Sequence, residues 1–177
     1  MKKHAKYLMV PVTVLAFAAV LWGCAAMDFE QLSEQERTFD KVYEAPEFSK
    51  EEIFNATKVW IAQNFRSAKA VIEHQDEEEG IIIGNGSMSY PCSMDDLSCY
   101  GTAGWKVDFT MRVDIKDEKF KLTFMNIMID TPPGEYSSGN RFPINSQAQL
   151  DAIKPELLSY GERILESMKT DEAKSDW

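Results

Sequence analysis

The feature of the sequence that most constrains the fold is an unbroken alternation of apolar and polar side chains over residues 105–115. Apolar side chains occupy the odd positions, and charged residues or threonine occupy the even ones. Because successive side chains of a β-strand point to opposite faces, this pattern predicts a strand with one buried and one solvated face. We therefore expect a sheet that packs on one of its faces.

A second alternating segment follows at once and predicts an antiparallel partner for this strand. Its apolar residues of one parity are Phe120, Leu122, Phe124 and Met128. If the turn centres on Asp117-Glu118, the register pairs Ile115 with Phe120, Val113 with Leu122, Met111 with Phe124 and, on the polar face, Asp114 with Lys121. The same register places Phe109 opposite Asn126, a polar residue on the apolar side.

The remaining segments complete an α+β pattern. Ser49 and Glu52 have the spacing of a capping box and predict a helix that ends near Arg66. Strands are expected over residues 39–45, 68–75 and 81–90, a loop over 131–145, and a helix from 147 onward with Pro155 in the first turn of its main part. This order predicts a β-α-β4-α fold, in which two helices cover one face of an antiparallel sheet.

The first residues have the pattern of an export signal. Three lysines among residues 2–6 precede an apolar run over residues 7–22, which is shorter than the roughly 20 residues that a membrane-spanning helix needs. The run ends in Leu21-Trp22-Gly23-Cys24, which resembles the lipobox of bacterial lipoproteins. An uncleaved signal anchor with an incidental cysteine is the alternative.

The resemblance to lipoproteins implies a lipid anchor. It implies that residues 1–23 are removed, that the thiol of Cys24 carries diacylglycerol and that the new amino terminus is acylated. Ala25, in the place after the cysteine, resembles the residues of lipoproteins sorted to the outer membrane. We then expect a polar tether over residues 24–38, a single domain over 39–170 and a frayed tail over 171–177.

The charge of the exported part disfavours nucleic acid as a partner. Without the three lysines of the signal, 16 basic residues face 29 acidic ones, and no basic stripe offsets them locally. Such a chain repels phosphate backbones.

Two further cysteines, Cys92 and Cys99, flank a polar segment of six residues. Because exported proteins lie in oxidising compartments, we expect a disulfide between them. Two free thiols are the alternative, and a metal or redox site would need ligands that the neighbouring sequence does not supply.

The sequence contains no recognisable catalytic, metal or cofactor site. His74 is the only histidine outside the signal, and we read it as a structural residue. The acidic run over residues 76–79 fits a solvated turn better than a calcium loop. The large aromatic residues fit a packed core, with an apolar ligand pocket as the alternative: Trp60, Trp105, Phe109, Phe120 and Phe124.

Three segments resemble a known bacterial family over about residues 39–130: KVYEAPEFSKEEIFNATKVWIAQNF, IEHQDEEEGIIIGNG and WKVDFTMRVDIKDEKFKLTFMNI. The family is a domain of unknown function with a TATA-binding-protein-like fold, common in secreted and lipid-anchored proteins. The resemblance implies the β-α-β4-α fold and supplies no activity. We expect a non-enzymatic envelope module that binds another protein, a glycan or a small apolar molecule. A carboxylate-based enzyme and a carrier of an apolar ligand are the alternatives.

Overall fold

The structure is a computed structural model that describes residues 31–65, 72–91, 101–134 and 138–172. Residues 171 and 172 are described by their backbone only. The export signal, Cys24, Cys92 and Cys99 lie outside the described residues.

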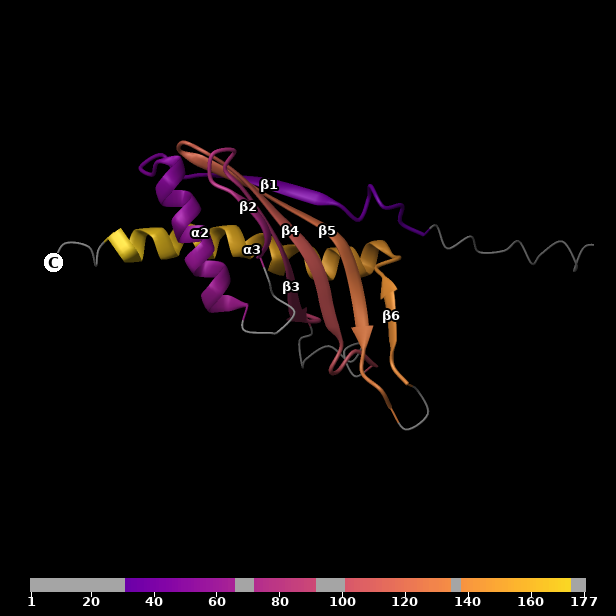
Figure 1. The fold of residues 1–177 in the computed structure, drawn as a ribbon. Coiled ribbons are helices and arrows are strands. Elements are labelled where there is room, and N and C mark those ends of the chain that lie inside the picture. Colours follow the sequence, from indigo (N-terminus) through magenta and orange to yellow (C-terminus); the bar gives the residue numbers. More distant parts are fainter. Residues whose placement is uncertain (1–30, 66–71, 92–100, 135–137, 173–177) are drawn as a thin grey trace, which may run out of the picture. The chain divides into compact units, whose positions relative to one another are not determined.

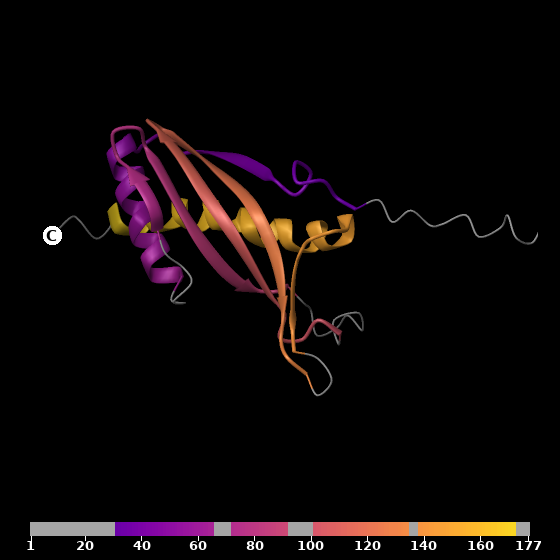
Figure 2. The ribbon, with the colours of Figure 1, turned by 45° about the vertical axis from the view of Figure 1, so that its right-hand side comes forward.

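The described chain forms an antiparallel sheet with two helices on one of its faces (Figures 1 and 2). The sheet order is β1-β5-β4-β3-β2. The strand β6 also pairs with β5, beyond the end of β1: β1 pairs with residues 119–124 of β5 and β6 with residues 128–131. The elements are β1 (Phe39–Glu44), α2 (Lys50–Asn64), β2 (Ile72–Asp76), β3 (Ile81–Ser89), β4 (Lys106–Lys116), β5 (Lys119–Thr131), β6 (Asn140–Pro143) and α3 (Gln147–Glu172). The α+β class and the sheet covered on one face are thus confirmed.

The central hairpin has the expected register. The turn lies at Asp117-Glu118, between the paired residues Lys116 and Lys119. The expected pairs are all present: Ile115 with Phe120, Val113 with Leu122, Met111 with Phe124 and Asp114 with Lys121. The apolar members of these pairs are at most 2% exposed, so they form the centre of the core.

Beyond Phe124 the register differs from the expected one because β5 contains a β-bulge. Thr110 pairs with Met125 but Asp108 pairs with Met128, so β5 has one residue more than β4 in this interval. Asn126, with φ of 53°, is the residue in the left-handed conformation there. The extra residue reverses the parity of the strand. The expectation that Met128 faces the core was therefore wrong, as was the pairing of Phe109 with Asn126.

The buried residues after the bulge are Ile127 and Ile129, at 2% and 0% exposure. Met128 lies on the other face, half buried. The bulge thus lets the two apolar runs of β5, which differ in phase, both reach the same core.

Two expectations for the C-terminal half need correction. The expected loop over residues 131–145 contains β6, whose Arg141 pairs with Asp130 of β5. Pro143 is tolerated there because β6 is a short strand at the edge of the sheet. Pro155 lies inside α3 and not in its first turn, because the helix already begins at Gln147.

The helix α2 begins as its capping box predicts. The Ser49 side chain accepts a hydrogen bond from the Glu52 backbone N–H, and the Glu52 carboxylate accepts one from the Ser49 N–H at 2.8 Å. The Ser49 hydroxyl also donates to the Glu52 carboxylate at 2.7 Å, and this hydrogen bond, together with the one from the Ser49 N–H, lowers the pKa of Glu52. The apolar face of α2 packs on the sheet through residues that include Ile53, Phe54 and Trp60.

One buried polar atom on this face has no partner. Thr57 is 0% exposed, and its Oγ1 has no hydrogen bond within the described part of the chain. Valine has the same branched shape without the hydroxyl, so it removes the desolvation cost and keeps the packing. We expect Thr57→Val to raise the free energy of unfolding by about 1 kcal/mol. Urea denaturation measures the change, and a loss of stability would show that the hydroxyl is paired.

Aromatic rings fill the space between the sheet and the helices. The Tyr160 ring of α3 lies at the centre of this cluster, with ring centroids at 5.3 Å from Trp60, 5.6 Å from Phe65, 6.1 Å from Phe109 and 6.2 Å from Phe124. Burial raises the pKa of Tyr160 to about 12. The expectation that these aromatic residues form the core is met here, whereas Trp105 packs apart from them, against Tyr90 and Phe142.

A close contact joins α3 to β1. The Tyr43 hydroxyl donates a hydrogen bond to the Leu158 carbonyl, and the Tyr43 ring stacks on Phe120 at 5.2 Å. Burial raises the pKa of Tyr43 to about 12, and the nearby Glu162 carboxylate adds to the shift. A Cβ atom on Gly161 would overlap the Tyr43 ring, so this contact requires a glycine.

The residues just before β1 are joined to the domain. The Leu32 N–H donates a hydrogen bond to the Asn145 carbonyl at 3.3 Å, and the Leu32 side chain packs against the core. The folded part of the chain therefore includes the end of the segment expected as a tether.

Candidate functional site

The sheet face opposite the helices carries a row of polar side chains that spans four strands. The Asn85 Nδ2 on β3 donates to the Glu73 carboxylate on β2 at 2.5 Å. The Thr110 hydroxyl on β4 donates to the Asn85 Oδ1 at 2.9 Å, and the Asn126 Nδ2 on β5 donates to the Thr110 Oγ1 at 3.3 Å. This polar ladder, made of Glu73, Asn85, Thr110 and Asn126, fixes the orientation of two amides and one hydroxyl.

An ion pair lies next to the polar ladder. The Arg141 guanidinium of β6 lies 3.2 Å from the Asp108 carboxylate of β4, and their side chains are 54% and 11% exposed. Because the carboxylate is almost covered and the guanidinium is open, the pair presents hydrogen-bond donors to solvent while its acid is fixed.

Three members of the polar ladder (Asn85, Thr110 and Asn126) and the ion pair line one hollow of about 390 Å³, which we call the open-face hollow. Its size lies within the range of about 300–1,000 Å³ that is typical of small-molecule sites. Its lining comes from β3, β4, β5 and β6: Asn85, Gly86, Asp108, Phe109, Thr110, Asn126, Met128 and Arg141.

The bulge accounts for the position of Asn126 in this hollow. A bulge re-aims a side chain and ends regular pairing, and bulges are frequent beside functional sites. Asparagine adopts the left-handed conformation at lower cost than other residues with a Cβ, glycine aside. The sequence therefore places at this position a polar residue that tolerates the backbone conformation.

This backbone conformation leads to a testable difference between two variants. Asn126→Ala and Asn126→Gly both lose the hydrogen bond to Thr110, but only alanine is strained at φ of 53°. We expect the alanine variant to be less stable than the glycine variant by about 1 kcal/mol. Thermal and urea unfolding of the two proteins give this difference directly, and equal stabilities would mean that the bulge relaxes in the alanine variant.

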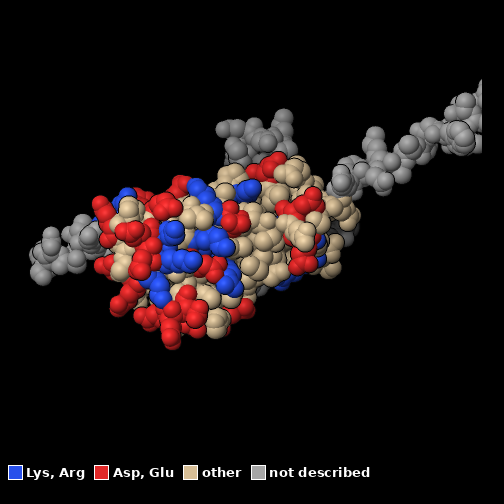
Figure 3. Space-filling model, turned by 90° about the horizontal axis from the view of Figure 1, so that it is seen from above, with Lys and Arg blue, Asp and Glu red and all other residues tan. Residues whose placement is uncertain are grey.

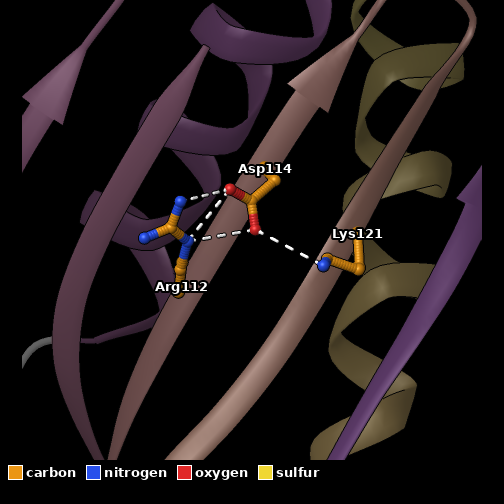
Figure 4. A network of polar contacts seen from close by, with 3 residues as sticks. All are labelled: Arg112, Asp114 and Lys121. Carbon is orange, nitrogen blue, oxygen red and sulfur yellow. Dashed lines mark hydrogen bonds and ion pairs between the residues drawn. The ribbon is translucent and has the colours of Figure 1, made fainter. Parts of the chain in front are cut away.

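A charged network extends the polar face toward the hairpin turn (Figure 4). The Arg112 guanidinium donates to the Asp114 carboxylate at 2.6, 2.9 and 3.1 Å, and the Lys121 Nζ lies 3.9 Å from the same carboxylate. Hydrogen bonding to Asp114 raises the pKa of Arg112. Figure 4 shows the three side chains on the side of β4 and β5 away from the helices.

Positive and negative side chains lie next to each other on the molecular surface. In the view of Figure 3, Lys and Arg side chains gather beside Asp and Glu side chains. The Arg112–Asp114–Lys121 network is one such arrangement.

Of the residues that the sequence singled out as candidates, Phe109 lines this hollow, whereas His74 and the acidic turn lie elsewhere. His74 is exposed on β2, and the Asp76 carboxylate accepts a hydrogen bond from the Glu79 N–H at 2.9 Å, as in an ordinary polar turn. Cys24, Cys92 and Cys99 lie outside the described residues, so the lipid site and the disulfide remain predictions. Within the described ranges, no three His, Cys, Asp or Glu side chains are grouped so that they could hold a metal ion.

In the part of the chain that the structure describes, neither α2 nor α3 is long and apolar enough to cross a bilayer.

Sequence reasoning missed the polar residues of the hollow. Their contacts depend on pairing between strands that are separated in the chain, such as Asn85 with Thr110 and Asp108 with Arg141. One signal was present in the sequence. The apolar alternation of β5 changes phase between Phe124 and Ile127, and such a change indicates a bulge.

Comparison with known proteins agrees with this architecture. Residues 39–130 match the model of a domain of unknown function, DUF4468, with a TBP-like fold. No curated protein sequence matches the chain.

A solved structure has the same fold. A TBP-like protein from Parabacteroides distasonis superposes with a TM-score of 0.58 at 14% identity, over 82% of this chain and 97% of that one. A DUF4468 family protein from Bacteroides ovatus gives 0.45 at 14% identity, over 75% and 80% of the two chains. The family match spans more than half of the sequence, and the sheet with its two helices has the fold that the family describes. The chain belongs to the DUF4468 family of domains with a TBP-like fold.

Proposed function

We propose that this protein is a lipid-anchored envelope protein whose folded domain is a non-enzymatic binding module, and that the open face of its sheet binds the partner. The proposal rests on one difference between the two faces of the sheet: one is covered and the other is open. The helices and a cluster of rings fill one face, and the other holds the open-face hollow beside an ordered polar ladder.

The packed face gives no support to a carrier of apolar ligands. The rings of Trp60, Phe65 and Tyr160 contact one another at 5.3–5.6 Å in the space where an apolar ligand would lie between sheet and helices. The open face, in contrast, presents groups that are already oriented by hydrogen bonds, which lowers the entropy cost of binding.

The anchor and the domain are separate parts of the proposal and have separate tests. For the anchor, the mass of the protein isolated from host membranes is expected to be that of a chain starting at Cys24 with diacylglycerol and one further acyl chain. Cys24→Ala is expected to keep residues 1–23, whereas Cys92→Ala, the matched control, is expected to be processed normally. A wild-type chain that retains Met1 or carries an unmodified Cys24 would contradict the anchor.

For the binding face, a photo-crosslinking residue is placed at Thr123, which lies on the open face, and at Glu166, which is exposed on α3. In intact envelopes we expect a discrete crosslinked product from position 123 and none from position 166. The same product from both positions, or from position 166 alone, would show that the open face is not the binding surface.

A further inference from the structure

The open-face hollow is balanced in charge. Its lining contains one carboxylate, Asp108, and one guanidinium, Arg141, and these two groups pair at 3.2 Å. Because the carboxylate of Asp108 offsets the charge of the Arg141 guanidinium, the hollow offers no net charge to attract an anion or a cation. The electrostatics of the hollow thus favour a neutral ligand.

The hollow offers both donors and acceptors at close range. Asn126 uses one N–H of its amide for Thr110, and because the residue is exposed, its second N–H and its Oδ1 face solvent. Arg141, with a side chain 54% exposed, adds further N–H donors. A ligand that both donates and accepts at neighbouring atoms, as adjacent hydroxyl groups do, matches this set.

An apolar ligand does not fit the same set. It would cover the amides of Asn85 and Asn126 and the Thr110 hydroxyl without replacing their contacts with water, and burial of unpaired polar groups is costly. One apolar contact is nevertheless available, because the half-buried Met128 side chain lines the hollow. A thioether side chain adapts its shape and packs against C–H groups.

We infer that the open-face hollow binds a neutral saccharide, with its hydroxyl groups on Asn85, Asn126 and Arg141 and a C–H face of the ring on Met128. This inference rests on the proposed binding function and names the ligand class of the same face. The polar ladder holds both amides in place before the ligand binds, so binding costs little additional side-chain entropy.

The test uses the full-length lipoprotein in detergent micelles, with ¹⁵N-labelled side-chain amides observed by NMR. The probes are two neutral tetrasaccharides, maltotetraose and tetra-N-acetylchitotetraose, with tetragalacturonate and the unacetylated chitosan tetramer as the anionic and cationic counterparts. We expect a neutral probe to shift the side-chain amide resonances of Asn85 and Asn126, and the charged probes to shift them less at equal concentration.

Two variants locate the site. Asn126→Gly keeps the left-handed backbone and removes the amide, so the affinity for the neutral probe should fall about tenfold. Met125→Ala is the matched control, since Met125 precedes the bulge on the same face but does not line the hollow. Its affinity should equal that of the wild type, and the backbone spectrum shows whether each variant is folded.

The inference is overturned if neither neutral probe shifts these amides, if a charged probe shifts them more, or if the two variants lose affinity equally. If position 123 still gives its discrete crosslinked product in envelopes, such a result contradicts the saccharide inference but not the proposed function. If that product is absent as well, the proposed function fails together with the inference.

Discussion

Replacement of Gly161 with alanine should destabilise the domain by about 2–3 kcal/mol, although alanine is the better helix former. An added Cβ would overlap the Tyr43 ring. The ring has no space to move away, because Phe120 stacks on it and the Tyr43 hydroxyl is held by the Leu158 carbonyl. The helix α3 would have to move away from β1, which would open the core on both sides of the contact.

Gly134→Ala is the matched control for this substitution, since a Cβ at Gly134 meets no atom within 4 Å. Urea denaturation is expected to show a large loss for Gly161→Ala and almost none for Gly134→Ala. Equal stabilities of Gly161→Ala and the wild type would mean that α3 and β1 are not packed as the structure shows.

Truncation of Phe124 to alanine should have the largest effect, a loss of about 3–5 kcal/mol. The side chain is 0% exposed, and its ring lies 5.6 Å from Phe39 and 5.6 Å from Phe109. It therefore joins β1, β4 and β5 beneath the helices, and its removal leaves a cavity that rigid neighbours cannot fill. Domains of this size have total stabilities of about 5–15 kcal/mol, so this single substitution removes a large part of the stability.

A graded series makes this prediction specific to packing. Phe124→Leu should lose clearly less than Phe124→Ala, because most of the volume is kept. Phe142→Ala, at a half-buried position on β6, is expected to cost less than Phe124→Ala. A loss below about 1 kcal/mol for Phe124→Ala would contradict a core centred on this residue.

The parts of the fold that sequence reasoning predicted correctly depend on local signals. The capping box at Ser49 and Glu52 satisfies backbone groups within one helical turn, so its pattern is visible in four residues. The β4–β5 hairpin is nearly as local, because its turn joins two strands adjacent in the chain. Both of its faces, through pairs such as Ile115 with Phe120 and Asp114 with Lys121, agreed on a single register.

Two errors arose where one local rule was extended too far. Strict alternation predicts the wrong face after Asn126, because one extra residue reverses the faces of everything that follows in β5. The prolines and glycines of residues 131–145 predict a loop, yet four residues ending in Pro143 suffice for an edge strand.

The candidate site was beyond sequence reasoning for a different reason. No residue of the open-face hollow belongs to a recognisable motif. A single asparagine, threonine or methionine on a solvated sheet face does not indicate a binding site. The hollow exists only when four strands bring Asn85, Thr110, Asn126 and Arg141 together. The one warning in the sequence was the change of phase in β5, which marked the position but not its partners.

The pairing of β1 with β5 sets the order in which the domain can assemble. Phe39 lies beside Phe124, a residue 85 positions later, so the first strand of the domain waits for one of the last. Loop closure over such a distance is slow in comparison with hairpin formation. The meander from β2 to β5 can form early on its own, whereas β1 joins it late, and a chain truncated before Lys119 has no strand on which β1 can dock.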